Sequence, residues 1–455
     1  MKKNDIVTLE ITGLTSEGNG VARYDGMAVF VPFAAVGDKI EARIVKVNKT
    51  FAFAKIEKIN IPSADRIDND CPAFGKCGGC AFRHINYRAE LNAKEGFVKD
   101  AFERLGGFCF GEDFEFLPIM GAENDSRYRN KLQMPVGKDN NGRIVCGFYA
   151  GRSHRIIPAS DCLLQNSAFA EIVGFIAEKA EKYGISVYNE EKHEGVLRHI
   201  YLRRGNATGE ICVTLVARRK VPEFTKLARE IAGKFSEVTG VVLNINPEKT
   251  NVILGEREEV LFGKAWISDV MSGVRVEISP KSFYQVNTPM AEKLYGIAAD
   301  FADFGENETV LDLYCGIGTV GLSMAQKTGK LIGAEIVPEA VENAVKNARL
   351  NGVSNAEYIC ADAGKAAAEL EKRGLRPDVI LLDPPRKGCD ETTLASCAAM
   401  KPEKIVMISC NPATAARDCK RLRELGYKPV KLKAVDLFPR TVHVECVVSM
   451  SRKAE

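Results

Sequence analysis

The last third of the chain alternates short apolar segments with segments of helical periodicity. Such alternation predicts an α/β fold, in which a parallel sheet carries helices on both faces. Ligands of these sheets bind beyond the carboxyl ends of the strands, so a functional site is expected there. The apolar segments predict seven strands, at 310–314, 331–335, 356–361, 379–383, 405–410, 428–435 and 443–450.

The first sixty residues show a different pattern, with short alternating segments separated by glycine turns. Even strand spacing over about fifty residues resembles a five-stranded oligonucleotide-binding barrel. The segments GNGVAR (18–23) and VPFAAVGD (31–38) resemble those of a TRAM domain, which implies a role in RNA binding. Strands are predicted at 6–10, 27–31, 39–47 and 51–59, with a turn at 18–20.

A chain of 455 residues is too long for one ordinary hydrophobic core, so several domains are expected. We predict an OB-like β-barrel at 1–60, a mixed α+β central domain at 61–285 and a catalytic α/β domain at 286–455. A helical segment at about 87–107, which ends at two glycines, is expected to pack on the catalytic domain.

The composition indicates a cytoplasmic protein. No apolar run approaches the ~18 to 20 residues of a membrane span, and the first ten residues lack the apolar core of a secretion signal. The 14 cysteines are therefore expected to be thiols, metal ligands or catalytic groups. The net charge of +3 carries little information, but residues 127–155 hold seven Lys or Arg side chains against the one acid Asp139. This basic stretch favours a polyanionic partner.

A glycine-rich loop follows the first strand of the predicted sheet. Gly316, Gly318 and Thr319 open a helix, and Glu335 lies 19 residues beyond Gly316 at the end of the next strand. The pattern fits a dinucleotide, because glycines let the backbone approach the ligand and the acid binds ribose hydroxyls. The same geometry serves S-adenosylmethionine, so this motif does not decide between the two.

The remaining strand ends favour the methyl donor. Asp383 begins the segment Asp-Pro-Pro-Arg after the fourth strand, a form that is common in nucleic-acid methyltransferases and not expected in dehydrogenases. Asp312, Tyr314 and Asp362 add polar groups at other strand ends of the same sheet. Each acid alone would be explained as a helix cap or a surface charge, whereas their shared position predicts a cofactor site.

Two further motifs carry the chemistry. Cys410 lies in Ser-Cys-Asn-Pro at the end of the fifth strand, and Glu445 closes the segment 440–445 (RTVHVE) in the last predicted strand. On these motifs the chain resembles, over essentially its whole length, the 5-methyluridine methyltransferases of RNA, the TrmA and RlmD group. The resemblance implies that Cys410 is the nucleophile and Glu445 the base. It also implies four cofactor ligands, which are Gln285, Tyr314, Glu335 and Asp383.

The expected reaction requires such a pair. Carbon 5 of uracil is a poor nucleophile, so a thiolate must add to carbon 6 before carbon 5 can accept a methyl group. A carboxylate must then remove the proton from carbon 5 to release the enzyme. A free thiol has a pKa of ~8.5, so the surroundings of Cys410 are expected to help ionise it.

A cysteine cluster precedes the predicted helix. Cys71, Cys77 and Cys80 supply three soft ligands, and Cys162 is the candidate for the fourth. The spacing leaves zinc and an iron–sulfur cluster open. Resemblance to the RlmD branch implies a [4Fe-4S] cluster and 23S ribosomal RNA as the substrate, because the tRNA-directed branch lacks both the barrel and the cluster.

Three other functions compete with this interpretation. A methylthiotransferase would place its TRAM domain after the catalytic one and use another cysteine spacing. A base-amine methyltransferase would not need Cys410, and a non-catalytic RNA-binding protein would not need the combined cofactor and reacting residues. Substrate RNA is expected to present an unstacked uridine, with Phe33, Tyr128 and Phe148 as candidate stacking platforms.

Overall fold

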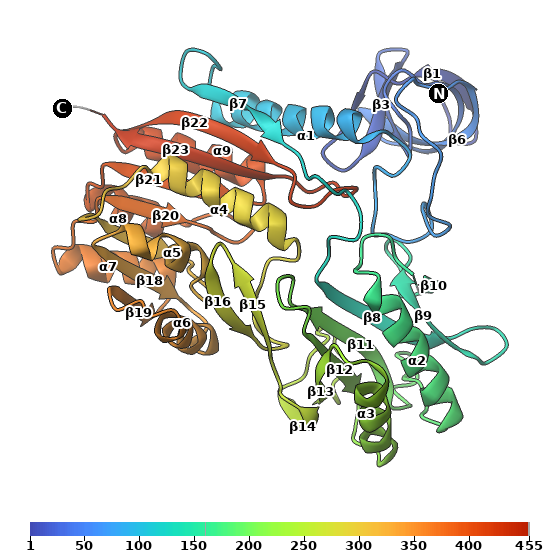
Figure 1. The fold of residues 1–455 in the computed structure, drawn as a ribbon. Coiled ribbons are helices and arrows are strands. Elements are labelled where there is room, and N and C mark those ends of the chain that lie inside the picture. Colours follow the sequence, from blue (N-terminus) through green and yellow to red (C-terminus); the bar gives the residue numbers. More distant parts are fainter. Residues whose placement is uncertain (160, 454–455) are drawn as a thin grey trace.

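The structure, a computed structural model, describes residues 1–159 and 161–453. Figure 1 shows a small barrel, a central sheet with two helices and a larger sheet with helices on both faces. No helix in the described part of the chain has the length and apolar character that a membrane span requires.

The N-terminal barrel is a six-stranded sheet with the order β1-β5-β6-β4-β3-β2. Alternate side chains such as Val7 and Leu9 point into its core, as the alternating sequence predicted. The expected turn at 18–20 is shorter than predicted, because Gly18 alone has a left-handed φ of 79° and Asn19 already begins a strand. The strands are β1 (Ile6–Glu10), β2 (Gly13–Leu14), β3 (Asn19–Tyr24), β4 (Met27–Pro32), β5 (Lys39–Val47) and β6 (Phe51–Ile61).

The central sheet has seven strands in the order β10-β9-β8-β11-β12-β13-β14. Helices α2 (Ala168–Lys182) and α3 (Glu223–Lys234) bury their apolar faces in the core that they share with this sheet. The strands are β8 (Lys131–Lys138), β9 (Ile144–Tyr149), β10 (Ile156–Pro158), β11 (Leu197–Arg204), β12 (Ile211–Ala217), β13 (Val238–Ile245) and β14 (Arg257–Gly263).

A hairpin of β15 (Ile267–Met271) and β16 (Val274–Ile278) leads from the central sheet into the C-terminal sheet, whose order is β19-β18-β17-β20-β21-β23-β22-β7. Its first five strands are parallel, as predicted, but β23 runs antiparallel between β21 and β22. The strands are β7 (Glu115–Met120), β17 (Thr309–Leu313), β18 (Lys330–Glu335), β19 (Ala356–Cys360), β20 (Val379–Leu382), β21 (Lys404–Ser409), β22 (Tyr427–Val435) and β23 (Glu445–Arg452).

Helices cover both faces of this sheet, and each face has its own apolar core. One core takes side chains from α1 (Tyr87–Ala101), α7 (Ala363–Lys372), α8 (Glu391–Ala399) and α9 (Pro412–Glu424). The other takes side chains from α4 (Thr288–Ala302), α5 (Thr319–Met324) and α6 (Pro338–Leu350). A 3₁₀-helix, η2 (Ala325–Lys327), follows α5.

The helix α1 and the strand β7 lie against the C-terminal sheet, although they precede the central sheet in the sequence (Figure 1). Asn86 starts α1, because its side chain accepts a hydrogen bond of 2.9 Å from the backbone of Ala89. The helix continues as a π-helix, η1 (Phe102–Gly106), and Gly107 ends it with a left-handed φ of 65°. The division at 60/61 and 285/286 stays a prediction.

Candidate active site

The glycine-rich loop and Glu335 form one wall of a cavity of about 470 Å³. Gly316 takes a φ of 56°, and its backbone N–H donates to a carboxylate oxygen of Glu335 at 3.1 Å. The other oxygen of Glu335 accepts from the backbone of Val337 at 2.9 Å, so the carboxylate is held at the cavity. The opposite wall includes Ser279 and Phe283, which follow β16. A ligand with ribose hydroxyls and a flat ring fits this polar and aromatic lining.

Gln285 and Thr319 meet at a residue that the sequence did not single out. The hydroxyl of Tyr295, in α4, lies near the side chains of both, which lower its pKa. Burial raises the pKa of Tyr295, and the charge of Asp383 raises it further. In the sequence Tyr295 fits the apolar periodicity of α4, and for that reason it reads as an ordinary core residue.

Two predicted cofactor ligands have other contacts in the structure. Tyr314 has a left-handed φ of 69°, and its hydroxyl contacts Thr393 and Cys389 instead of facing the cavity beside Glu335. Asp362 caps α7, where its side chain accepts a hydrogen bond from the backbone of Lys365 at 3.3 Å. Their roles as cofactor ligands stay predictions.

Three acids at strand ends share one buried region. Burial raises the pKa of Asp383 to about 7. Burial also raises the pKa of Asp312 to about 8 and that of Glu445 to about 8, and the charge of Asp383 raises both further. Asp312 accepts one hydrogen bond, from the backbone of Gly321 at 3.1 Å. Mutual repulsion of this kind is relieved by a positively charged ligand.

Cys410 and Glu445 come from two neighbouring antiparallel strands. Ser409 of β21 pairs with Cys446 of β23. Cys410, which follows Ser409, therefore faces Glu445, which precedes Cys446. Burial raises the pKa of the Cys410 thiol, and the negative charge of Glu445 raises it further. Glu445 is only 4% exposed. The predicted nucleophile and base therefore lie together, although 35 residues separate them in the sequence.

Arg386 is the counter-charge of this pair. It lies close to Cys410, and its charge lowers the pKa of the Cys410 thiol and that of Glu445. One guanidinium nitrogen also lies 3.2 Å from each ring nitrogen of His443, and it donates to the one that carries no proton. Burial lowers the pKa of His443 to about 4, and Arg386 lowers it further, so the imidazole is neutral and accepts the bond. The side chain of Asn411 holds the loop in place by donating to the Arg386 carbonyl at 3.0 Å.

The four predicted cysteine ligands line one cavity of about 170 Å³. Burial raises the pKa of Cys77 and raises that of Cys80 to about 12, and the nearby thiols add to both shifts. Among the described residues, no group of three His, Cys, Asp or Glu side chains is arranged to hold a metal ion. The cavity lining brings together Cys71, Cys77, Cys80 and Cys162, although Cys162 is far from the other three in the sequence.

A larger, basic cavity of about 640 Å³ lies beside the start of β8 and of α4. Its lining includes Arg127, Arg129, Arg204 and Lys293. Burial lowers the pKa of the neighbouring Lys131 to about 8. The charges of Arg203 and Arg129 lower it further, which shows that positive charge is concentrated there. A polyanion would relieve this repulsion.

The three candidate stacking aromatics differ in exposure. Phe33 is 38% exposed and packs edge-on against Phe74, with 5.1 Å between the ring centroids. Tyr128 donates its hydroxyl proton to the carbonyl of Pro439 at 3.0 Å. Phe148 packs against the core of the central sheet and lines the cysteine cavity. Phe33 is therefore the one of the three with an open ring face.

Two family models match the chain. The TRAM domain model matches residues 2–56, and the model described as tRNA (Uracil-5-)-methyltransferase matches residues 201–453. A protein of Bacillus cereus named "Uncharacterized RNA methyltransferase" is 43% identical over 453 residues, which are 99% of this chain and 98% of that protein. A protein of Clostridium tetani with the same name is 42% identical over 99% of this chain and 97% of its own length.

A solved structure is also similar over the full length. It is the Pyrococcus abyssi tRNA (uracil-54, C5)-methyltransferase in complex with S-adenosyl-L-homocysteine. The similarity covers 98% of this chain and 100% of that one, with a TM-score of 0.77 and 27% sequence identity.

Proposed function

Because this chain belongs to the tRNA (uracil-5-)-methyltransferase family, we propose that it methylates carbon 5 of a specific uridine in 23S ribosomal RNA, with S-adenosylmethionine as the donor. The membership confirms the resemblance read from the motifs around Cys410 and Glu445. The predicted fold is confirmed as well, with a TRAM barrel before a class I methyltransferase sheet. The activity on uracil in RNA follows from the family, whereas the choice of 23S RNA is the proposal.

The observation that carries the proposed chemistry is the pairing of Cys410 with Glu445 beside Arg386. A thiol that adds to carbon 6 must lose its proton, and a guanidinium at its side favours the thiolate. The nearby carboxylate has the opposite effect on the thiol pKa, so the guanidinium offsets part of that penalty. The arrangement suits covalent catalysis on a pyrimidine ring.

The residues present fit the donor. Glu335 and Gly316 would hold its ribose in the 470 Å³ cavity, while Asp383 directly follows β20 and Gln285 lies in the segment before α4. The repelling carboxyl groups of Asp312, Asp383 and Glu445 favour a cationic ligand, and the donor is a sulfonium. When bound, it supplies the methyl group.

The chain's own residues would then perform the bond changes on uracil. The Cys410 thiolate adds to carbon 6, and the electron pair of the C5=C6 bond moves into an enolate, which makes carbon 5 nucleophilic. After carbon 5 has gained the methyl group, Glu445 removes the proton that carbon 5 still carries. The C5=C6 bond reforms as the bond between Sγ and carbon 6 breaks, and Cys410 leaves as a thiolate.

RNA would be held by the barrel and the basic cavity. The TRAM barrel presents Phe33 as a platform on which a base can stack. Arg129 and Arg204 would bind phosphates, whereas Arg127 is already paired with Asp161. The target uridine must leave its stack to reach Cys410, so a loop or a distorted single strand is the expected substrate.

We further propose that the cysteine cavity holds a [4Fe-4S] cluster with a structural role. Four cysteines are the usual ligand set of such a cluster. The four cysteines line one cavity, which supports a shared four-thiolate site, and a single zinc ion bound by the same thiolates at ~2.3 Å is the alternative. The methyl transfer moves no electron between redox centres, so none of its steps needs the cluster.

Transfer RNA is the alternative substrate. The Pyrococcus abyssi structure supports it, since a protein of similar architecture is named as a tRNA methyltransferase. The four cysteines support 23S RNA, because the resemblance that includes them is to the branch acting on ribosomal RNA, whereas the barrel does not discriminate, since the similarity to the tRNA methyltransferase covers 98% of this chain.

One experiment tests both the reaction and the substrate. The protein is incubated with methyl-labelled donor and, separately, with 23S RNA and tRNA from cells that lack it, and the labelled nucleotide is mapped. We expect 5-methyluridine at a discrete position in 23S RNA. Label in tRNA alone would replace the proposed substrate, and label on a base other than uracil would overturn the proposed reaction.

A further inference from the structure

The loop between β22 and β23 leads directly into the proposed base. Val435 and Glu445 are the last paired residues of the two strands, so residues 436–444 form the connection. Within the part of the chain that the structure describes, no group donates a hydrogen bond to the Glu445 carboxylate. Its position therefore depends on its backbone, which is fixed by strand pairing on one side and by this loop on the other.

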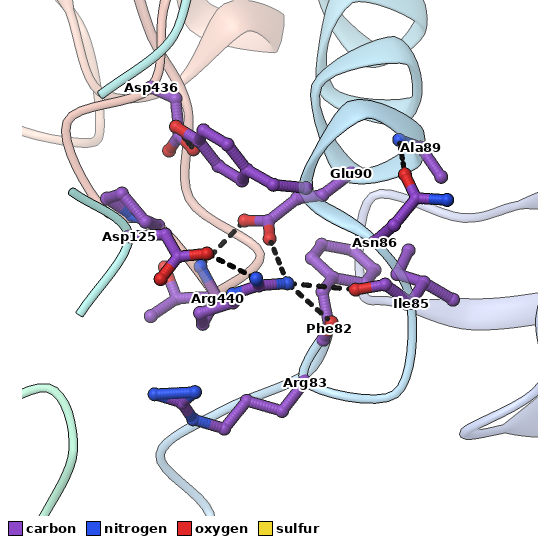
Figure 2. A network of polar contacts seen from close by, with 12 residues as sticks. Phe82, Arg83, Ile85, Asn86, Ala89, Glu90, Asp125, Asp436 and Arg440 are labelled. Carbon is purple, nitrogen blue, oxygen red and sulfur yellow. Dashed lines mark hydrogen bonds and ion pairs between the residues drawn. The ribbon is translucent and has the colours of Figure 1, made fainter. Parts of the chain in front are cut away.

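Arg440 lies at the centre of the loop, is 6% exposed and has a left-handed φ of 69° (Figure 2). Its backbone N–H donates to Glu90 at 2.7 Å, and its carbonyl accepts from the backbone of Ala81 at 2.9 Å. Its guanidinium donates to the carbonyl of Ile85 at 2.8 Å and pairs with Asp125. Both the backbone and the side chain of this one residue are thus held by other segments.

A second cation holds the start of the same loop. Lys94 in α1 donates to Glu90 and to Asp436 at 2.7 Å each, and to the carbonyl of Phe438 at 3.1 Å. The side chains of Lys94, Glu90 and Asp436 are fully buried. Glu90 therefore joins the two cations, since it binds Lys94 directly and the backbone of Arg440 as well.

Other parts of the molecule contact the loop too. Asn287 donates to the carbonyl of Leu437 at 3.0 Å, and Tyr128 donates to Pro439. On the barrel side Gly18 approaches so closely that an added Cβ would lie 3.1 Å from the Val442 side chain. Residues 436–444 are therefore contacted by the barrel, by α1, by the catalytic sheet and by Ala81 and Phe82, which follow the cysteine cluster.

Buried ion pairs are a poor source of net stability, because the desolvation of both charges offsets most of their attraction. They do fix geometry, since moving either partner leaves a buried charge without its counter-ion. A network that surrounds one loop, with a strained residue at its centre, is therefore better explained by positioning than by stability.

We infer that Arg440 is a positioning residue that holds the Glu445 backbone where its carboxylate can take the carbon 5 proton. The inference rests on the proposed function. The step affected is the last one, in which Glu445 gains the proton, the C5=C6 bond reforms and Sγ leaves carbon 6. Thiol addition and methyl gain precede that step and do not need Glu445 in place.

Arg440→Met, Arg440→Lys and the exposed control Arg88→Met on α1 separate these steps. RNA containing 5-fluorouridine is trapped without proton removal, because fluorine cannot leave carbon 5. For Arg440→Met we expect trapping within about threefold of the unchanged protein, and turnover on ordinary RNA lower by about tenfold or more. The methylated RNA should accumulate as a covalent adduct on denaturing gels. The turnover of Arg440→Lys should lie between that of Arg440→Met and that of the unchanged protein, and Arg88→Met should match the unchanged protein in both trapping and turnover.

The inference is overturned if Arg440→Met keeps its turnover, or if trapping and turnover fall by the same factor in both Arg440 variants. An equal fall would mean that the network supports the fold as a whole. Should Arg440→Met not fold, the split between trapping and turnover is read from Arg440→Lys alone. If the unchanged protein is itself not trapped by 5-fluorouridine RNA, the proposed function fails instead, so the two failures are distinguishable.

Discussion

Cys410 and Glu445 face each other across two antiparallel strands, one residue beyond the pair formed by Ser409 and Cys446. Both groups are more basic than in water, because burial favours their protonated forms, and the charge of Glu445 adds to this for Cys410 as that of Asp383 does for Glu445. Arg386 opposes both effects.

Cys410→Ala should abolish methylation, with a loss of more than about 10³-fold in rate, because carbon 5 cannot be activated without the sulfur. The same variant should not be trapped on 5-fluorouridine RNA. Cys109→Ala removes an exposed thiol far from the strand ends in sequence and is the matched control. Label incorporation by Cys410→Ala at the unchanged rate would exclude covalent catalysis by this residue.

Glu445→Gln should slow turnover by at least about 10²-fold, since the general base is lost. Addition of Cys410 and methylation of carbon 5 should still take place, so a methylated covalent complex with ordinary RNA is expected to accumulate. Denaturing gel electrophoresis of the labelled complex measures it. A variant that is slow but accumulates no complex would show that Glu445 acts before proton removal.

Arg386→Met should shift the pH dependence. Cys410 reacts as a thiolate and Glu445 as a carboxylate, so the rate rises with pH through their pKa values, and that of Glu445 is about 8. Arg386 lowers the pKa of both groups, so its loss moves the rising limb to higher pH. We expect a loss of about tenfold at pH 7 that becomes smaller towards pH 9. A pH-independent loss would assign Arg386 to RNA binding instead.

Cys80→Ser should remove the proposed cluster. Anaerobically purified protein is expected to contain about four iron and four sulfide per chain, and the variant should lose both together with thermal stability. Cys109→Ser, again outside the cavity, should keep them. Stoichiometric zinc without iron in the unchanged protein would reject the cluster.

Local patterns predicted the residues at the strand ends well. Gly316 and Glu335 meet through a hydrogen bond, because a parallel sheet brings the ends of neighbouring strands to one edge. The last strand is predicted at 443–450, but β23 begins only at Glu445, so residues 443 and 444 belong to the loop. In that loop Arg440 contacts Glu90 and Asp125 and has a left-handed backbone.

Other features had no local signal at all. Strand β7 joins the edge of the C-terminal sheet beside β22, although more than 300 residues separate Glu115 from its partner Lys431. Tyr295 fits an apolar pattern, and yet its hydroxyl lies near the side chains of Gln285 and Thr319. Arg386 was visible only as the end of Asp-Pro-Pro-Arg, and its place beside Cys410 depends on how two loops pack.

By itself the sequence determined the barrel and the parallel sheet and placed the glycine-rich loop and Cys410 at strand ends, because hydrophobic period and glycine placement are properties of neighbouring residues. The tertiary structure alone decided which charges surround Cys410 and Glu445 and which distant segments hold residues 436–444. Contacts of that kind join residues far apart in the chain, and no spacing along the sequence encodes them.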